Sequence, residues 1–206
     1  MKKILCMMAC AGLMAACNTS SPKTEDMKTK PFLDLFQPLA PAEMTDNVFK
    51  LVGQDFTVIT AGTEINYNSM TASWGGWGIL FNEPTTWCIL RASRYTLEFI
   101  RKENLYTMCY FDEQYKDQVM LFGSASGRSS DKMKQHTLTP VETPEGSIAY
   151  KEAKLIIECE LTEITTVNPD DFYTADGRSF ITEAYEEAHD YHKLVFGKIA
   201  NVWVKK

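Results

Sequence analysis

The chain has 206 residues, of which 45% are apolar, and a formal net charge of −6 at pH 7. This length and apolar content favour one domain with a substantial core. Because the chain is acidic and has no cluster of basic residues, we expect no nucleic-acid partner.

The first residues are typical of a bacterial export signal. Two lysines precede an apolar segment, 4–14, that is too short to span a membrane. The sequence LMAAC at 13–17 resembles a lipobox, in which Cys17 would carry the lipid. We therefore predict a signal peptide at 1–16 and a protein lipid-anchored in the bacterial cell envelope, periplasmic or at the outer membrane. The alternative is a plain secreted protein cleaved after Ala16.

Residues 17–42 are predicted to form a lipidated tether and an amino-terminal arm. Residues 18–30 are polar and show no apolar period, which is typical of a flexible tether. Residues 31–42, PFLDLFQPLAPA, are apolar and punctuated by prolines, so we expect an irregular arm packed on the domain. The domain itself is predicted to occupy 43–206.

Short strands dominate the predicted domain. Runs rich in β-branched and aromatic residues predict strands at 55–61, 65–72, 77–81, 85–91, 105–111, 153–165 and 193–204, with a glycine pair interrupting the chain before 77. Short helices are expected at 96–102, with Thr96 as its N-cap, and at 112–120 and 131–136. The pattern predicts a mainly β fold, a small β-barrel with helical insertions.

The cysteines and histidines predict no metal site. Cys88, Cys109 and Cys159 each lie in an apolar run, and their spacing suits no zinc motif. We expect them to be buried cysteines of strands. His189 and His192 are three residues apart but have no matching pattern of cysteines or carboxylates.

The stretch NSMTASWGGWG at 68–78 combines small hydroxyl side chains with two tryptophans. Asn68, Thr71 and Ser73 lie on one predicted strand and its exit. Gly75 and Gly76 would let a ligand approach the backbone, because no Cβ stands in the way. This stretch is the first candidate for a binding surface.

Residues 91–96, RASRYT, precede the first predicted helix. Two arginines, a serine and a threonine at a helix N-terminus favour an anion such as a phosphate. The alternative is a simple helix cap with arginines on a solvated face.

A Ser/Gly loop with basic residues follows at 124–132, SASGRSSDK. It is a second candidate anion cradle, although it lacks the spacing of a P-loop. The alternative is an ordinary solvent loop with Asp131 as an N-cap.

In this order, the three segments resemble those of the flavin reductase-like family, whose fold is an FMN-binding split β-barrel. The matching motifs are NxMTASW, RxxRYT and SGRxxDK, and HKLVFGKI at 192–199 resembles the closing strand of that family. The resemblance covers about 47–204.

The resemblance implies FMN as the cofactor and assigns roles to residues. The isoalloxazine and ribityl chain would be lined by Asn68, Met70, Thr71, Ala72 and Ser73, with Trp74 or Trp77 shielding an apolar part. The phosphate or ribityl end would be held by Arg91, Ser93, Arg94 and Thr96, and the phosphate side closed by Ser126, Gly127, Arg128 and Lys132. His192 is the catalytic candidate, near the flavin or an incoming nicotinamide.

The same resemblance implies an oxidoreductase that moves hydride or electrons through FMN from a reduced donor, with NADH and NADPH as candidates. One alternative is an exported flavoredoxin-like electron carrier with a partner protein, and another is a structural lipoprotein without a ligand. Relatives of this kind imply a homodimer, and only the lipid anchor would contact the membrane. An exported location leaves the electron source open.

Overall fold

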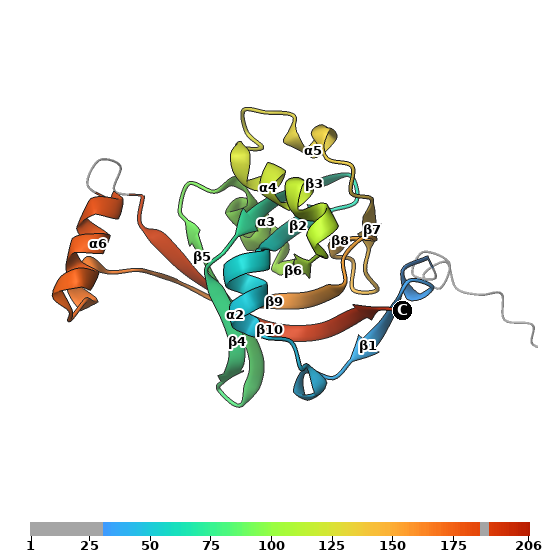
Figure 1. Cartoon of the computed structure of the whole chain (residues 1–206), viewed down its shortest axis with the longest axis horizontal. Helices are drawn as coiled ribbons and strands as arrows, with labels where there is room; N and C mark the ends of the chain where they lie inside the picture. Colours follow the sequence, from blue (N-terminus) through green and yellow to red (C-terminus); the bar gives the residue numbers. More distant parts are fainter. Residues whose placement is uncertain (1–30, 186–189) are drawn as a thin grey trace, which may run out of the picture.

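The computed structural model describes residues 31–185 and 190–206 (Figure 1). The predicted signal peptide, the tether, the lipidation site at Cys17 and His189 lie outside the described residues. No helix in the described part of the chain is long and apolar enough to cross a membrane.

One antiparallel sheet forms the body of the molecule. Its order is β3 (Asn66–Ala72), β2 (Thr57–Thr63), β6 (Leu105–Tyr110), β9 (Leu155–Thr166), β10 (His192–Lys205), β5 (Glu83–Arg91) and β4 (Gly75–Leu80). The prediction of a mainly β fold with helical insertions is confirmed. The glycine pair does not interrupt the chain before β4, because Gly75 and Gly76 belong to that strand and pair with β5.

The last strand, β10, organises the curvature of the sheet. Its first half pairs with β5, and its far end pairs with β1 (Phe36–Leu39). The register with β9 shifts after Phe196 and again after Ile199, and such bulges bend a sheet. Gly197 is required at the first bend, since a Cβ there would lie 2.3 Å from the Tyr106 hydroxyl.

The sequence predicted an irregular amino-terminal arm, and this prediction is wrong for residues 36–39. Residues 36–39 form β1 and extend the main sheet along β10. The prolines led to the wrong prediction, but Pro38 lies on an edge strand, where a missing N–H is tolerated.

Short helices and a hairpin surround the sheet. They are η1 (Pro41–Glu43), α2 (Val48–Lys50), η2 (Leu51–Asp55), α3 (Tyr95–Glu103), η3 (Glu113–Tyr115), α4 (Lys116–Ser124), α5 (Lys132–Gln135), β7 (Pro140–Glu142), β8 (Ile148–Tyr150), η4 (Pro169–Asp171) and α6 (Ala175–Tyr185). Helix α6 projects from the barrel at the opposite end from β1 (Figure 1). The sequence analysis missed α2, α6 and the β7–β8 hairpin.

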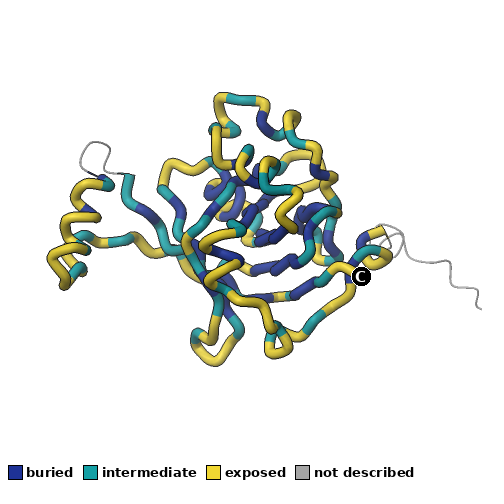
Figure 2. Tube along the Cα trace, in the orientation of Figure 1, coloured by how far each residue is buried: buried dark blue, intermediate teal, exposed yellow. Residues whose placement is uncertain are grey.

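Two apolar clusters cover the two faces of the sheet, and buried residues concentrate along its central strands (Figure 2). Leu97 and Ile100 of α3 pack with Met108 on one face, whereas Phe122 of α4 packs with Ile156 on the other. The three described cysteines are buried and free, as the sequence predicted.

One buried carboxylate interrupts this apolar interior. Glu158 of β9 is fully buried, and the donors around it are neutral. It accepts hydrogen bonds from the Thr143 hydroxyl, from Asn201 Nδ2 at 3.1 Å and from Trp203 Nε1 at 3.3 Å. Glu158 therefore ties the turn after β7 to the end of β10.

Replacing Glu158 by Ala should lower the free energy of unfolding by about 3 kcal/mol, because it leaves three donors, two of them buried, without their acceptor. Urea denaturation followed by circular dichroism measures the loss. The matched control is Glu160→Ala, an exposed residue two positions along the same strand, which should cost little. Equal costs for the two variants would contradict this account of Glu158.

Candidate functional site

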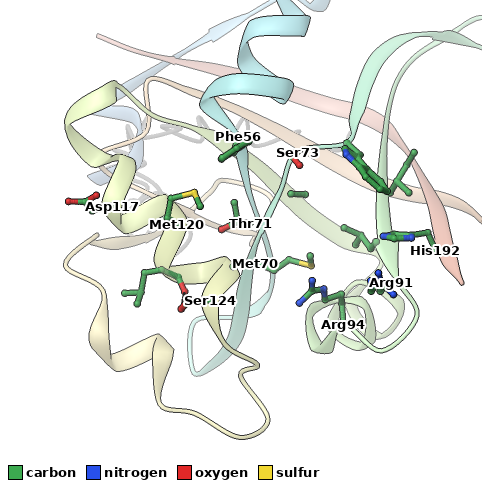
Figure 3. Close-up of a pocket in the computed structure, with 16 residues that line it drawn as sticks. Phe56, Met70, Thr71, Ser73, Arg91, Arg94, Asp117, Met120, Ser124 and His192 are labelled. Atoms are coloured by element: carbon green, nitrogen blue, oxygen red, sulfur yellow. Dashed lines mark hydrogen bonds between the residues drawn. The ribbon is translucent and has the colours of Figure 1, made fainter. Parts of the chain in front are cut away.

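Strand β3 leaves one of its edges without a strand partner in the described structure, because it pairs with β2 alone. A cavity of about 710 Å³ lies along that edge. Figure 3 shows Met120 and Ser124 of α4 on one side of the cavity, and Arg91, Arg94 and His192 on the other. An edge strand offers unpaired backbone donors and acceptors, so a polar planar ligand could pair with β3 here.

A smaller lobe of about 340 Å³ lies beside this cavity. Met70 and Arg94 border both spaces, so the two are adjacent. The lobe lies where β3, the start of α3 and the Ser/Gly loop meet, which brings the three sequence segments together.

Apart from Trp77, all the predicted cofactor-binding residues and His192 line this joint cavity. The larger space contains Met70, Thr71, Ala72, Ser73, Trp74, Arg91, Arg94 and His192. The smaller lobe contains Asn68, Met70, Ser93, Arg94, Thr96, Ser126, Gly127, Arg128 and Lys132. Their contact with a cofactor remains a prediction.

The two chain segments that face β3 in the smaller lobe both lie against Asn68. Its side-chain amide donates to the Thr96 hydroxyl at 2.6 Å. The sequence predicted Thr96 as the N-cap of α3, but Arg94 occupies that position and Thr96 lies within the helix. On the other side, a Cβ on Gly127 would lie 2.1 Å from Asn68 Oδ1, so only glycine allows this approach.

Lys132 places a buried ammonium group beside the smaller lobe. Its Nζ donates to the carbonyl oxygens of Phe122 at 2.8 Å and Ala125 at 2.9 Å. Burial, and then the charge of Arg94, lower the pKa of Lys132 to about 8. An ammonium has three donors, and these carbonyls use two, so one N–H remains for an anion in the lobe.

The two arginines of the lobe differ in their partners. Arg128 forms an ion pair with Glu98 and lies over the Tyr95 ring, 4.6 Å from its centre. Arg94 has no ion pair with any described residue, and it borders both lobes. Arg94 is therefore the better placed of the two to bind an anion.

Ser93 already holds a carboxylate. Its backbone N–H and its hydroxyl donate to the two oxygens of Asp190, at 2.9 and 2.5 Å. A ligand would have to share or replace these contacts. Sequence reasoning missed Asp190, because nothing in its local sequence marks a partner 97 residues away.

His192 enters the cavity at the start of β10, where it pairs with Arg91 of β5. It is buried, and its ring centre lies 5.0 Å from that of Trp74. Burial first, and then the charge of Arg91, lower the pKa of His192, so its ring is neutral at pH 7. The residue that fixes this ring, Tyr185 of α6, has no signal in the sequence.

Phe56 forms a wall of the larger space and has an unusual backbone. Its φ of 65° and ψ of 159° lie in a region that is normally restricted to glycine. Lys116 lies 4.3 Å above the centre of its ring and donates to the Gln54 carbonyl oxygen. Sequence analysis missed this wall.

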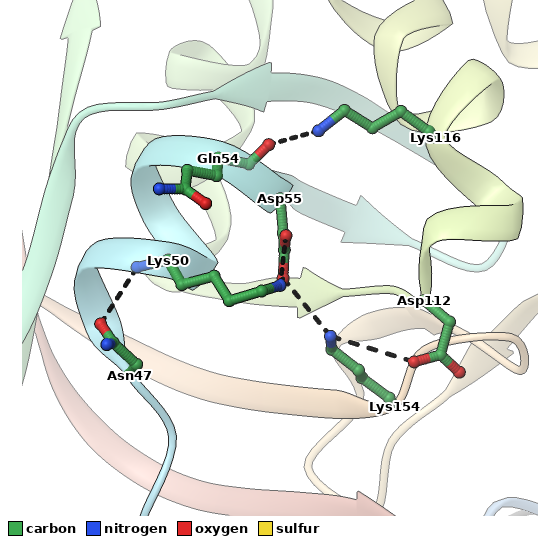
Figure 4. Close-up of polar contacts among 7 residues, drawn as sticks. All are labelled: Asn47, Lys50, Gln54, Asp55, Asp112, Lys116 and Lys154. Atoms are coloured by element: carbon green, nitrogen blue, oxygen red, sulfur yellow. Dashed lines mark hydrogen bonds and ion pairs between the residues drawn. The ribbon is translucent and has the colours of Figure 1, made fainter.

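Asp55, which directly precedes Phe56, is held by two lysines (Figure 4). Its carboxylate accepts from Lys50 Nζ at 2.6 and 2.7 Å and from Lys154 Nζ at 3.5 Å. Burial works to raise the pKa of Asp55, but its hydrogen bonds and charge contacts with the two lysines outweigh burial and lower the pKa below 3.8. The strained Phe56 therefore follows a carboxylate that is clamped in its ionised form.

Because the folded-state pKa of Asp55 is lowered, its contribution to stability is complete above the unfolded pKa of about 3.9 and is lost as pH falls through the folded value. Asp55→Asn should therefore lower Tm clearly at about pH 6, and the difference from the parent should shrink toward about pH 3. Scanning calorimetry measures both. Glu113→Gln, at an exposed residue, serves as the control, and a difference for Asp55→Asn that is constant with pH would refute the clamp.

Within the described residues, no group of three or more His, Cys, Asp or Glu side chains is placed to hold a metal ion. Apart from Asp117 at the α4 side, the charged groups that line the cavity are cations, and they lie around an open strand edge, which suits an anionic organic ligand.

Solved structures of the same fold support a split β-barrel. An FMN-binding protein of Thermus thermophilus is 21% identical, with a TM-score of 0.57 over 82% of this chain and 77% of that chain. A flavoredoxin of Methanosarcina acetivorans is 19% identical, with a TM-score of 0.54 over 80% and 75%. The NADH:FAD oxidoreductase of Streptomyces globisporus is 13% identical, with a TM-score of 0.53 over 74% and 78%. At these identities the likeness shows the fold alone.

The protein is therefore a split β-barrel of the type predicted from the sequence. Residues 49–206 match the family described as the flavin reductase like domain, and this match covers more than half of the chain. The chain belongs to the flavin reductase-like family. A comparison with curated protein sequences found no match.

Proposed function

We propose that the joint cavity binds FMN, with the isoalloxazine ring in the larger space and the phosphate in the smaller lobe. The single observation that carries this proposal is that a mostly apolar space lies directly beside a lobe lined by Arg94 and Lys132, two cations without a carboxylate partner among the described residues. Family membership and the FMN-binding relatives support the same ligand.

The smaller lobe suits a phosphate dianion. Arg94 and the Lys132 ammonium supply charge, and the N-terminus of the nine-residue helix α3 adds its partial positive charge. Burying the Lys132 charge without a nearby anion is unfavourable, as its lowered pKa indicates. A bound phosphate would relieve that cost.

The larger space suits a planar ring with a polar edge. Met70 and Ala72 present apolar side chains, while the free edge of β3 presents backbone groups. Trp74 is partly exposed beside His192, so it would cover one part of the ring. When bound, FMN would supply the hydride or electron chemistry, and the protein would bind, orient and shield it.

We propose further that the protein is an oxidoreductase that takes electrons from NADH or NADPH. Its second candidate function is that of an electron carrier served by a partner protein, which the flavoredoxin relatives favour. Anaerobic addition of NADH or NADPH to the FMN-loaded protein separates the two. Rapid bleaching of the flavin supports the reductase, and no bleaching supports the carrier.

The test of FMN binding itself is a visible absorption spectrum of the purified protein, followed by extraction of any flavin and titration with added FMN. A colourless protein that binds no added FMN would refute the proposal and favour a structural role.

We also propose that Cys17 carries a lipid that anchors the mature chain in the cell envelope, and that the protein is a homodimer. The LMAAC motif supports the anchor, and the family resemblance supports the dimer. Mass spectrometry of the mature chain tests the first, and light scattering tests the second. An unmodified Cys17 or a monomer would contradict the respective proposal.

Replacing Arg94 by Ala should weaken FMN binding by about one to two decades, because a charge-assisted hydrogen bond to phosphate contributes about 1.5–3 kcal/mol. Riboflavin, which has no phosphate, should lose far less affinity. Fluorescence titration measures both ligands. Arg101→Ala, an exposed arginine in the last turn of the same helix, is the matched control. Equal losses for FMN and riboflavin would refute the role of Arg94.

The affinity for FMN should fall as pH rises above about 8, the pKa of Lys132 in the free protein. Phosphate favours the protonated amine, so above this pKa binding must take up a proton, and Kd should rise by up to about tenfold per pH unit. Riboflavin, titrated over the same range, is the internal control and should show no such slope. If Kd for FMN and riboflavin change in parallel between about pH 7 and 9, Lys132 does not contact the phosphate.

A further inference from the structure

The imidazole of His192 is held from outside the barrel, by the last residue of α6. Tyr185 is buried, and its hydroxyl oxygen accepts the backbone N–H of His192 at 3.3 Å. The same hydroxyl is hydrogen-bonded to His192 Nδ1. One hydroxyl therefore fixes both the backbone and the ring of the residue that reaches into the cavity.

The hydroxyl proton determines the tautomer of this histidine. Its oxygen is already an acceptor for the backbone N–H, and among the described residues Nδ1 is the acceptor within reach of its proton. Buried polar hydrogens are almost always paired. The arrangement that satisfies every group therefore has the tyrosine donating to Nδ1. A neutral imidazole that accepts at Nδ1 carries its own proton on Nε2.

The proton on Nε2 is then available to the cavity. His192 lines the larger space, and no described residue forms a hydrogen bond with Nε2. The charged groups that face the ring come from β5, the start of α3 and the start of β10. Arg91 and Arg94 disfavour a charged imidazole, and Asp190 favours it. Burial is the largest effect and also disfavours the charge, so the ring stays a neutral donor.

Helix α6 is itself anchored at the cavity, which keeps Tyr185 in place. The guanidinium of Arg91 lies 5.6 Å from the centre of the Tyr185 ring and donates to the Ala184 carbonyl oxygen at 3.5 Å. Phe180 of the same helix lies 6.1 Å from Trp74, measured between ring centres. These contacts between α6 and the cavity converge on Tyr185 and Trp74, whose rings lie beside His192.

We propose that Tyr185 is a positioning residue that holds His192 in its Nε2–H tautomer, so that His192 donates a hydrogen bond to a carbonyl oxygen or an unprotonated ring nitrogen of the ligand. The class of ligand rests on the proposed binding of FMN. The tautomer rests on the contacts of Tyr185 alone, so the two can fail separately.

Two-bond proton–nitrogen correlation spectra test the tautomer. They are recorded on the full chain, labelled with ¹⁵N and carrying no polyhistidine tag, so that only its own histidines give signals. His192→Gln assigns the signals. In the parent protein, Nδ1 of His192 should have the chemical shift of an unprotonated nitrogen, and Nε2 that of a protonated one. Tyr185→Phe keeps the ring but removes the hydroxyl. Both shifts should then move toward the average of two tautomers, and the pKa of His192 should rise.

The matched control is Tyr173→Phe. It removes an exposed hydroxyl from the same segment that connects β9 to β10, and it should change neither shift. A protonated Nδ1 in the parent, or unchanged shifts in Tyr185→Phe, would overturn the proposal.

The ligand side is tested by fluorescence titration with FMN. Tyr185→Phe should weaken binding about two- to fivefold, because only part of the population then has the donating tautomer and ring orientation, whereas Tyr173→Phe should not weaken it. An unchanged Kd in Tyr185→Phe would show that His192 does not donate to FMN. If the parent binds no FMN, the proposed function fails, while the spectra still decide the tautomer.

Discussion

The structure depends on an incomplete barrel. Strand β3 pairs with β2 alone, and its other edge faces the cavity. Unpaired strand edges are usually blunted or covered, because they invite pairing with other chains. Here the edge lies behind α4, α3 and the Ser/Gly loop, which keep other strands away but leave a space for a small ligand. The same feature that leaves the barrel open therefore creates the site.

Electrostatics then select what enters this space. The chain is acidic, yet three cations line the joint cavity: Arg91 in the larger space, Lys132 in the smaller lobe and Arg94 in both. Carboxylates temper this charge at its borders: Glu98 pairs with Arg128, and Asp190 binds Ser93. The buried Lys132 is held by two carbonyl oxygens, which are weaker partners for an ammonium than a carboxylate or phosphate would be. The lobe thus favours an anion that brings its own oxygens.

Local sequence predicted what local forces decide. The strands of the central sheet followed from β-branched and aromatic runs, and the cavity residues followed from three compact motifs. Errors arose where distant contacts decide. Thr96 looked like an N-cap, but Asn68 of β3 takes its hydroxyl. Residues 36–39 looked irregular until β10 provided a partner. Phe56, Asp190 and Tyr185 reach the site through the topology of the chain, so no nearby pattern marks them.

The residues that the motifs predict and those that they miss lie in different parts of the site. The residues that the motifs predict surround the lobe proposed for the phosphate and the strand edge proposed for the ring. The residues that the motifs miss surround His192, and they come from α6 and the segment that leads into β10. A fold fixes where a ligand lies, whereas the chemistry follows from the groups that face it. The motifs therefore predict the class of cofactor, whereas Tyr185, which holds His192, and Phe180, which packs near Trp74, come from a helix that no motif marks.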